Sequence, residues 1–129
     1  MTETRAESRA VSEFSILVVE DDAMLSLAME DILRKLGWTN LEFAFDLSSA
    51  LEITQSTLFS LAFLDVDLNG KPSLPVARQL RQNNVPWFFT TGFGSRFDFE
   101  ELQDAPIIRK PYSEQDIEQA VLKVQAQNS

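Results

Sequence analysis

Two apolar runs in this chain end abruptly in carboxylates. Residues 15–19 read Ser-Ile-Leu-Val-Val and lead directly into the acidic residues 20–22, and residues 61–64 read Leu-Ala-Phe-Leu directly before Asp65. A continuous apolar run of this length, without alternation of polar residues, indicates a strand that is buried on both faces. In open parallel sheets, ligands bind outside the carboxyl ends of the strands, so these acids are the first candidates for a functional site.

The remaining sequence alternates further strand and helix signals. Strands are predicted over residues 15–19, 41–45, 58–65, 85–91 and 106–109, and helices over residues 22–37, 47–57, 73–83 and 113–126. In residues 92–104 the apolar residues alternate, so the fourth helix expected there should be short or irregular. Together these signals predict an α/β fold, a doubly wound five-stranded parallel sheet with right-handed crossovers. Residues 1–13 are polar and predict a mobile N-terminal tail before one domain over 14–126.

Caps and apolar stripes fix where the helices should begin and which side should face inward. Asp22 is expected to cap the first helix and Gly37 to follow its end. Its predicted inward face consists of Leu25, Met29, Ile32 and Leu36. In the second helix Leu47, Ala50, Leu51 and also Leu58 are expected to face inward. Ser73 suits the start of the next helix, and Ser113 with Asp116 predicts a reciprocal cap on the last one.

The composition excludes several kinds of chemistry. The 129-residue chain contains no Cys and no His, and its net charge is −9. Disulfides, thiolate nucleophiles, phosphohistidine and most zinc sites are therefore excluded, and a bound metal would need oxygen ligands, as magnesium, calcium and manganese do. The negative charge argues against nucleic-acid or anionic-membrane partners, although a solvated acidic surface explains most of it. No apolar run could span a membrane and no signal core is present, so we expect a cytoplasmic protein.

The predicted strand ends bring four kinds of polar group to one edge of the sheet. These are the acids Glu20 and Asp21, the acid Asp65, the hydroxyl of Thr91 and the ammonium of Lys110. Carboxylates this close repel one another unless a cation lies among them, and a hard divalent cation such as Mg²⁺ meets that need. A metal, an ammonium and a hydroxyl together form a pocket for a phosphoryl group, with Asp65 as the nucleophile. Taken singly, each of these residues could equally be a turn or cap residue.

These residues and their motifs resemble the receiver domain of the response-regulator family of two-component signalling. The motifs are Ile-Leu-Val-Val-Glu-Asp-Asp at 16–22, Phe-Leu-Asp-Val-Asp-Leu at 63–68, Thr-Gly at 91–92 and Lys-Pro at 110–111. The resemblance implies a flavodoxin-like strand order 2-1-3-4-5 and a Lys–Pro bond that is often cis. It implies Asp65 as phosphoacceptor, Asp21 as a direct magnesium ligand, and Glu20 as an acid that acts through water.

The resemblance also implies roles for the other residues at the strand ends. Asp67 occupies the position where the family uses a backbone carbonyl on the metal. Thr91 resembles the switch hydroxyl, and Lys110 resembles the lysine that pairs with the phosphoryl group. The family's usual aromatic switch residue on the last strand is replaced here by Ile107. The stretch 86–94 is instead similar to stand-alone alphaproteobacterial receivers with a Pro-Phe-x-Phe-Ala-Thr-Gly-Tyr motif, which points to Phe93 as the substitute switch, or as a simple packing residue.

The resemblance implies a single-domain response regulator without an output domain. Phosphorylation of Asp65, supported by Mg²⁺, would then switch contacts with an unknown downstream protein. The phosphoryl group would come from a sensor histidine kinase or a phosphotransfer protein, and the only reactions on this chain would be self-catalysed phosphorylation and dephosphorylation. Two alternatives remain open: a haloacid-dehalogenase-like phosphatase using Asp65 and Asp67, and a pseudo-receiver that acts as an adaptor without phosphorylation.

Overall fold

Five parallel strands form a single sheet at the centre of the molecule. The computed structural model describes residues 14–92, 102 and 104–128. The strands are β1 (Ile16–Val19), β2 (Leu41–Ala44), β3 (Leu61–Asp65), β6 (Trp87–Thr91) and β7 (Ile107–Arg109). They lie in the order β2-β1-β3-β6-β7, and every neighbouring pair is parallel. The predicted doubly wound sheet, with strand order 2-1-3-4-5 in chain order, is therefore confirmed.

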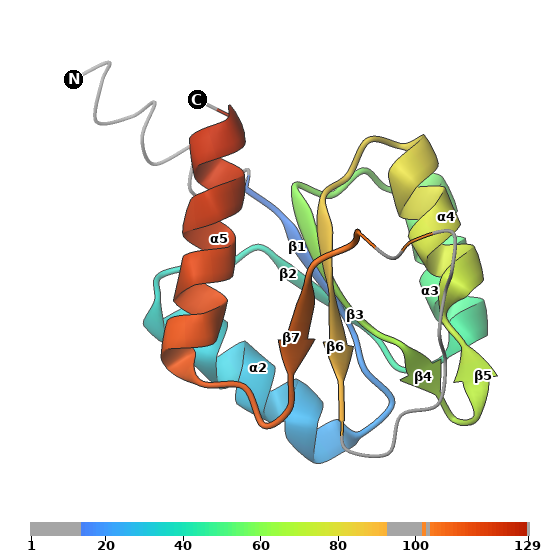
Figure 1. Ribbon diagram of the computed structural model, residues 1–129, viewed down its shortest axis with the longest axis horizontal. Helices are drawn as coiled ribbons and strands as arrows, with labels where there is room; N and C mark the ends of the chain where they lie inside the picture. The colour runs from blue at the N-terminus through green and yellow to red at the C-terminus, as the bar shows by residue number, and fades with distance from the viewer. Residues whose placement is uncertain (1–13, 93–101, 103, 129) are drawn as a thin grey trace.

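In the part of the chain that the structure describes, two helices lie on each face of this sheet (Figure 1). Helices α2 (Ala23–Lys35) and α5 (Glu114–Asn128) lie on one face, and α3 (Leu47–Ser56) and α4 (Leu74–Gln82) lie on the other. Alternate residues of β1 point to opposite sides, with Ile16 and Val18 toward α2 and α5, and Leu17 and Val19 toward α3 and α4. Every residue of β1 and β3 is buried, as their continuous apolar runs predicted.

The predicted caps explain where α2 and α5 begin. The Asp22 carboxylate accepts hydrogen bonds from the backbone N–H groups of Met24 at 2.9 Å and Leu25 at 3.1 Å, which have no partner inside the helix. At α5, Ser113 N donates to Asp116 Oδ2 at 3.0 Å while Asp116 N donates to Ser113 Oγ at 3.1 Å. Both caps lie directly beside the carboxyl edge of the sheet, so they fix the loops that carry the site.

The predicted inward face of α2 was only partly right. Its buried residues are Ser26, Met29 and Leu33, while Leu25, Ile32 and Leu36 are half-buried. The central stripe of the helix therefore lies one position away from the predicted one, because Ser26 is small enough to lie against the sheet. The inward placement of Leu58 was wrong, because α3 ends at Ser56 and Leu58 is 71% exposed in the loop that follows.

A small hairpin after β3 was not predicted. Strands β4 (Asp67–Leu68) and β5 (Lys71–Pro72) pair antiparallel across the turn residues Asn69 and Gly70. Both turn residues have positive φ, 55° and 84°, which matches the two-residue turns that suit a hairpin. The sequence indicated the turn, but strands of two residues are too short to show a periodicity. The hairpin holds Asp67 close to the end of β3.

Three predictions fall on parts of the chain outside the described residues. These are the N-terminal tail over 1–13, and with it the domain limits 14–126, and the short or irregular fourth helix in 92–104, of which the structure describes only 92, 102 and 104. All three stay predictions. Among the described helices, none has the length and apolar character that a membrane crossing requires.

Candidate functional site

The polar residues at the strand ends meet at one edge of the sheet, as predicted. Glu20 follows β1, Asp65 ends β3, Thr91 ends β6 and Lys110 follows β7. The parallel register aligns these ends, since Asp65 pairs with Thr90 and Lys110 N donates to Thr91 O at 2.8 Å. The cis bond expected between Lys110 and Pro111 is present.

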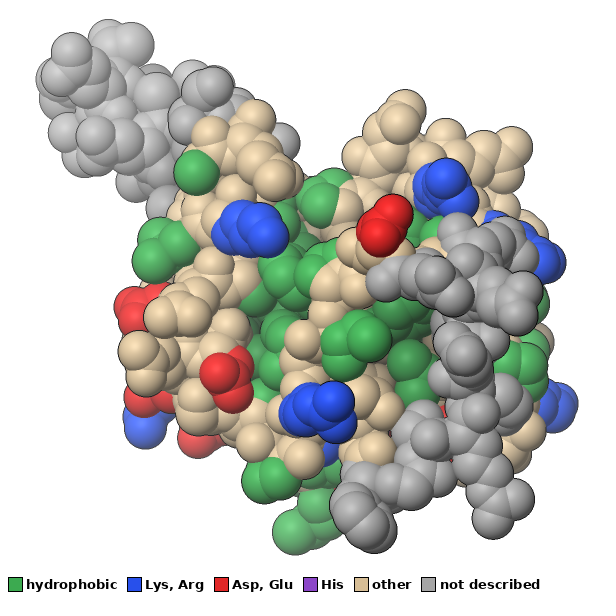
Figure 2. Space-filling view, in the orientation of Figure 1, with side chains coloured by type: hydrophobic (Ala, Val, Ile, Leu, Met, Phe, Trp, Pro, Cys, Tyr) green, Lys and Arg blue, Asp and Glu red, His purple; other side chains and the backbone are tan. Residues whose placement is uncertain are grey.

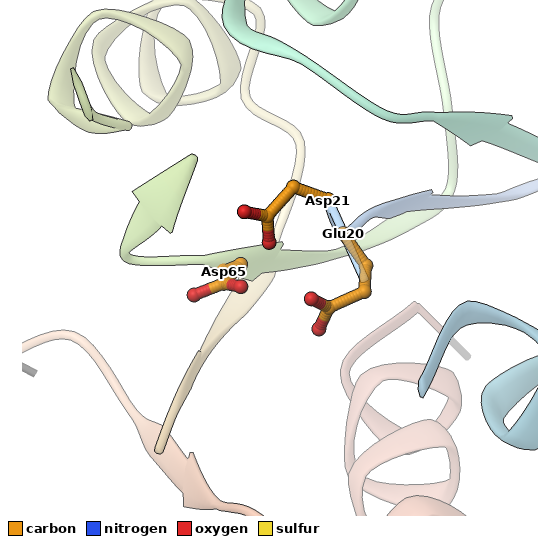
Figure 3. A group of neighbouring side chains, drawn as sticks. All are labelled: Glu20, Asp21 and Asp65. Carbon is orange, nitrogen blue, oxygen red and sulfur yellow. The ribbon is translucent and has the colours of Figure 1, made fainter. Parts of the chain in front are cut away.

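Three carboxylates converge at this edge (Figure 3). One oxygen from each of Glu20, Asp21 and Asp65 can be chosen so that all three lie within 4.8 Å of one another. Glu20 is 2% exposed and Asp65 4% exposed, while Asp21 is half-buried. Two of the three charges are therefore almost removed from water, where an unpaired charge is costly.

Among the described residues, the Lys110 ammonium compensates these charges. Lys110 Nζ donates to Asp65 Oδ2 at 2.7 Å and lies equally close, at 2.7 Å, to Glu20 Oε1, with which it forms an ion pair. One ammonium facing three carboxylates leaves this part of the described structure with a net negative charge.

The pKa values of the site show that burial disfavours the negative charges of its acids. The pKa of Glu20 is raised to about 7, because burial and the negative charge of Asp65 outweigh the opposing effect of Lys110. Burial also raises the pKa of Asp65, although Lys110 and the N–H of Asp67 act against it. Burial alone would lower the pKa of Lys110, but its two acidic partners raise it above the usual value. The ammonium therefore stays charged, while burial opposes the ionisation of both acids.

Backbone N–H groups orient each carboxylate. Asp22 N donates to Glu20 Oε2 at 3.1 Å, and Asp67 N donates to Asp65 Oδ1 at 3.1 Å. Asn69 N, in the hairpin turn, donates to Asp21 Oδ2 at 2.9 Å. These bonds fix the direction of all three acids from the two loops that follow β1 and β3.

The carboxylate of Asp67 forms a hydrogen bond within the hairpin. Its Oδ1 accepts a hydrogen bond from Gly70 N at 2.7 Å, inside the hairpin turn. The side chain thus has a structural partner that the sequence did not reveal. The part expected of its backbone carbonyl at a metal stays a prediction.

The expected switch residues are only partly described. The Thr91 hydroxyl donates to the carbonyl of Gly92 at 3.4 Å, a long bond, and to none of the described carboxylates. Phe93 lies outside the described residues. Ile107, at the position of the usual aromatic switch, is 58% exposed. The switching roles of Thr91 and Phe93 stay predictions.

Tyr112 is a residue of this site that the sequence analysis missed. Its ring is buried, and its hydroxyl donates to the carbonyl of Leu25 in α2 at 3.0 Å. Its place two residues after Lys110 was the only available signal, and nothing in the sequence showed that the hydroxyl would reach another element.

Two surface grooves among the described residues lie away from the carboxylate cluster. Two adjoining grooves of about 270 and 370 Å³ run between α5 and the strands β6 and β7, and they share Phe88, Pro106 and Lys123. Figure 2 shows the hydrophobic side chains that gather on this face. None of the strand-end acids lines either groove, so the carboxylate cluster is separate from both of them.

The donor set of the cluster fits a hard divalent cation. Glu20, Asp21 and Asp65 offer only carboxylate oxygens, the ligands that Mg²⁺ and Ca²⁺ prefer. The excess of negative charge, three carboxylates against the Lys110 ammonium, is a second reason for a cation there. The cluster is thus chemically suited to a metal, as the sequence predicted.

This parallel α/β fold carries acids and a lysine at the carboxyl edge of its sheet. Comparison with known proteins identifies the class of signalling domain to which it belongs. The profile of the response regulator receiver domain family matches residues 16–122. The chain therefore belongs to this family of two-component signalling domains, as its motifs predicted. It belongs to a signalling family and not to one of conventional enzymes.

Individual relatives agree with this assignment. The chemotaxis protein CheY of Pseudomonas aeruginosa is 25% identical over 116 residues, which cover 84% of this chain and 94% of CheY. The uncharacterized transcriptional regulatory protein YrkP of Bacillus subtilis is 31% identical over 113 residues. That match covers 84% of this chain and 48% of YrkP, so the chain corresponds to about half of that relative.

Solved structures show the same fold. The solution structure of SdrG from Sphingomonas melonis Fr1 superposes with a TM-score of 0.77 at 28% identity, covering 88% of this chain and 98% of SdrG. The receiver domain of the PhyR response regulator from Erythrobacter litoralis gives a TM-score of 0.75 at 23% identity, covering 90% of this chain and 92% of the domain. The second likeness concerns the fold alone.

The raised pKa of Glu20 predicts an unusual pH dependence of stability in metal-free protein. Between pH 4.5 and about 7, the folded state keeps a proton on Glu20 that the unfolded state has lost. The free energy of unfolding should therefore fall as the pH rises through this window. Glu20→Gln should flatten this fall and be more stable than wild type above pH 7. Urea unfolding followed by circular dichroism in EDTA measures both.

An exposed acid provides the control for this experiment. Glu118 lies on the exposed side of α5, and Glu118→Gln should keep the wild-type slope. A wild-type stability that rises between pH 5 and 7, or the same slope in Glu20→Gln, would contradict the charge arrangement described above.

Proposed function

We propose that this chain is a phosphoacceptor receiver domain that takes a phosphoryl group on Asp65 with the help of Mg²⁺. The observation that carries the proposal is the contact of 2.7 Å between Lys110 Nζ and Asp65 Oδ2, beside two further carboxylates. Asp65 is the central acid of the cluster, and each of its oxygens has a fixed donor. A nucleophile must be oriented and its developing charges stabilised, and this site provides for both.

In the proposed reaction, one Asp65 carboxylate oxygen attacks the phosphorus of a phosphorylated donor. A new oxygen–phosphorus bond forms, the bond from phosphorus to the donor atom breaks, and the donor leaves with that electron pair. Lys110 and the N–H of Asp67 hold the carboxylate in place and stabilise negative charge on the transferred group. Glu20, Asp21 and Asp65 would hold Mg²⁺ together with the backbone of Asp67, and the metal would supply positive charge that offsets the negative charge of the site and of the transferred group.

Phosphorylation would then change what the neighbouring groups bind. The acyl phosphate carries about −1.5 to −2 charges in place of the single charge of the carboxylate, which gives Lys110 and Thr91 a stronger partner. The present Thr91 bond to Gly92 O is long at 3.4 Å, so the hydroxyl gives up little by turning toward phosphate. We propose that Thr91, with Phe93 as its aromatic companion, transmits this change to residues 92–104 and so alters contacts with another protein.

Residues 1–129 contain no histidine, so a phosphohistidine donor would lie outside this stretch of sequence. A sensor histidine kinase or a phosphotransfer protein is the donor we propose, with a cytoplasmic location where such a kinase presents its phosphohistidine. A structure of SdrG is described as the BeF3-activated conformation, and it superposes here with a TM-score of 0.71 at 28% identity. That likeness supports the use of beryllofluoride as a phosphoryl mimic on this chain.

The phosphatase alternative has less support. It needs Asp67 as an acid beside the nucleophile, but the Asp67 carboxylate is engaged by Gly70 N in the hairpin.

The net charge of −9 opposes nucleic acid as a direct partner of this chain.

Covalent modification tests the nucleophile. With Mg²⁺ and acetyl phosphate, wild type should gain the mass of one phosphoryl group, and Asp65→Asn should gain none, because an amide is not nucleophilic there. Asp67→Asn is the matched control, since its amide oxygen can still accept from Gly70 N, and it should be modified like wild type. Intact-mass spectrometry gives the answer. An unmodified wild type, or a modified Asp65→Asn, would exclude Asp65 as the acceptor.

Hydrogen exchange tests the switch. Beryllofluoride with Mg²⁺ should change the exchange of backbone amides in 92–104 of wild type. Thr91→Val keeps the shape of the side chain without the hydroxyl, so it should bind the mimic but show a much smaller change. Mass spectrometry of peptic peptides measures both. Equal exchange changes in wild type and Thr91→Val would show that the hydroxyl does not transmit the signal.

A further inference from the structure

Tyr112 connects two parts of the site that lie far apart in the sequence. Its ring is 8% exposed, and its hydroxyl donates to Leu25 O at 3.0 Å across a separation of 87 residues. Leu25 belongs to the first turn of α2, directly after the loop that carries Glu20 and Asp21. Tyr112 itself follows Lys110 by two residues. The hydroxyl therefore joins the loop of the lysine to the loop of the acids.

The hydroxyl closes a ring of contacts. Leu25 N donates to Asp22 Oδ1 at 3.1 Å, and Asp22 N donates to Glu20 Oε2 at 3.1 Å. Glu20 Oε1 lies 2.7 Å from Lys110 Nζ, and the backbone of Lys110 leads through Pro111 back to Tyr112. Two links of this ring cross between the two loops, the contact of Lys110 with Glu20 and the hydrogen bond from Tyr112 to Leu25 O.

The Tyr112 hydroxyl keeps its proton, so it can always donate the hydrogen bond to Leu25 O. Burial raises the pKa of Tyr112, and the nearby negative charges of Glu20, Asp65 and Asp22 raise it further. The group therefore keeps its proton wherever the domain is folded. Leu25 O offers only an acceptor, so the direction of this bond is fixed.

We infer that the Tyr112 hydroxyl is a positioning group for Lys110, which keeps the ammonium between Asp65 and Glu20. A lysine side chain has many rotamers and does not by itself fix its ammonium. The position of the Lys110 backbone therefore decides how well the ammonium is placed between the two acids. On one side Lys110 N is held by Thr91 O at 2.8 Å, and on the other the Tyr112 hydroxyl holds the turn against α2. This inference rests on the proposed function, because Lys110 is expected to act on the phosphoryl group.

Tyr112→Phe tests the inference, because it removes the hydroxyl and keeps the ring. Thr54→Val is the matched control: Thr54 is 1% exposed, and its hydroxyl also donates to helix carbonyls, at 2.8 Å to Ala50 O and 3.1 Å to Leu51 O. It lies in α3, on the opposite face of the sheet. At saturating Mg²⁺, the maximal rate of Asp65 modification by acetyl phosphate should fall about tenfold in Tyr112→Phe and stay at the wild-type value in Thr54→Val.

A second measurement does not depend on phosphorylation. The Lys110 side chain is 11% exposed, so exchange of its ammonium protons with water, followed by ¹⁵N NMR, should be slow in wild type and in Thr54→Val. It should be faster in Tyr112→Phe. If wild type accepts no phosphoryl group, the proposed function fails, and the NMR result still decides whether Tyr112 positions Lys110. Wild-type exchange in Tyr112→Phe, or equal effects of both substitutions on rate and exchange, would overturn the inference.

Discussion

The Lys110 ammonium, placed between Asp65 and Glu20, is the interaction on which this site depends. Two acids that are almost fully buried would otherwise face each other without compensation, which costs several kcal/mol. The lysine reaches them because β7 runs parallel to β3 and ends at the same edge of the sheet. The strand order therefore determines the electrostatics of the site as much as the identity of its residues does.

This arrangement is a compromise between stability and chemistry. Three carboxylates share one ammonium, and the raised pKa values of Glu20 and Asp65 show that the folded state would be more stable with fewer charges there. The fold tolerates the cost because β1 and β3, which carry these acids, are buried along their whole length between two pairs of helices. A buried core beside an edge where charges are unfavourable suits a site that must respond strongly to an added cation or phosphoryl group.

The sequence predicted what depends on local patterns and on the geometry of parallel sheets. Continuous apolar runs identified β1 and β3, and the common edge of a parallel sheet predicted that Glu20, Asp65 and Lys110 lie together. Three features escaped prediction. Two are local: the strands of the hairpin β4–β5 are too short to show a period, and no sequence pattern indicated the hydrogen bond from Gly70 N to the Asp67 carboxylate. The third depends on a tertiary contact, the hydrogen bond of Tyr112 to a carbonyl 87 residues away.

The central claim is that this edge of the sheet is built to bind a divalent cation, and the dependence of stability on Mg²⁺ tests it most directly. If the folded state alone binds Mg²⁺, the free energy of unfolding should rise by about 1.4 kcal/mol for each tenfold increase in free Mg²⁺ above the dissociation constant. In Asp21→Asn, whose amide oxygen can still accept from Asn69 N, the rise should begin at a higher concentration. Potassium chloride at matched ionic strength is the control. A free energy of unfolding that responds to MgCl₂ no more than to potassium chloride would contradict this account.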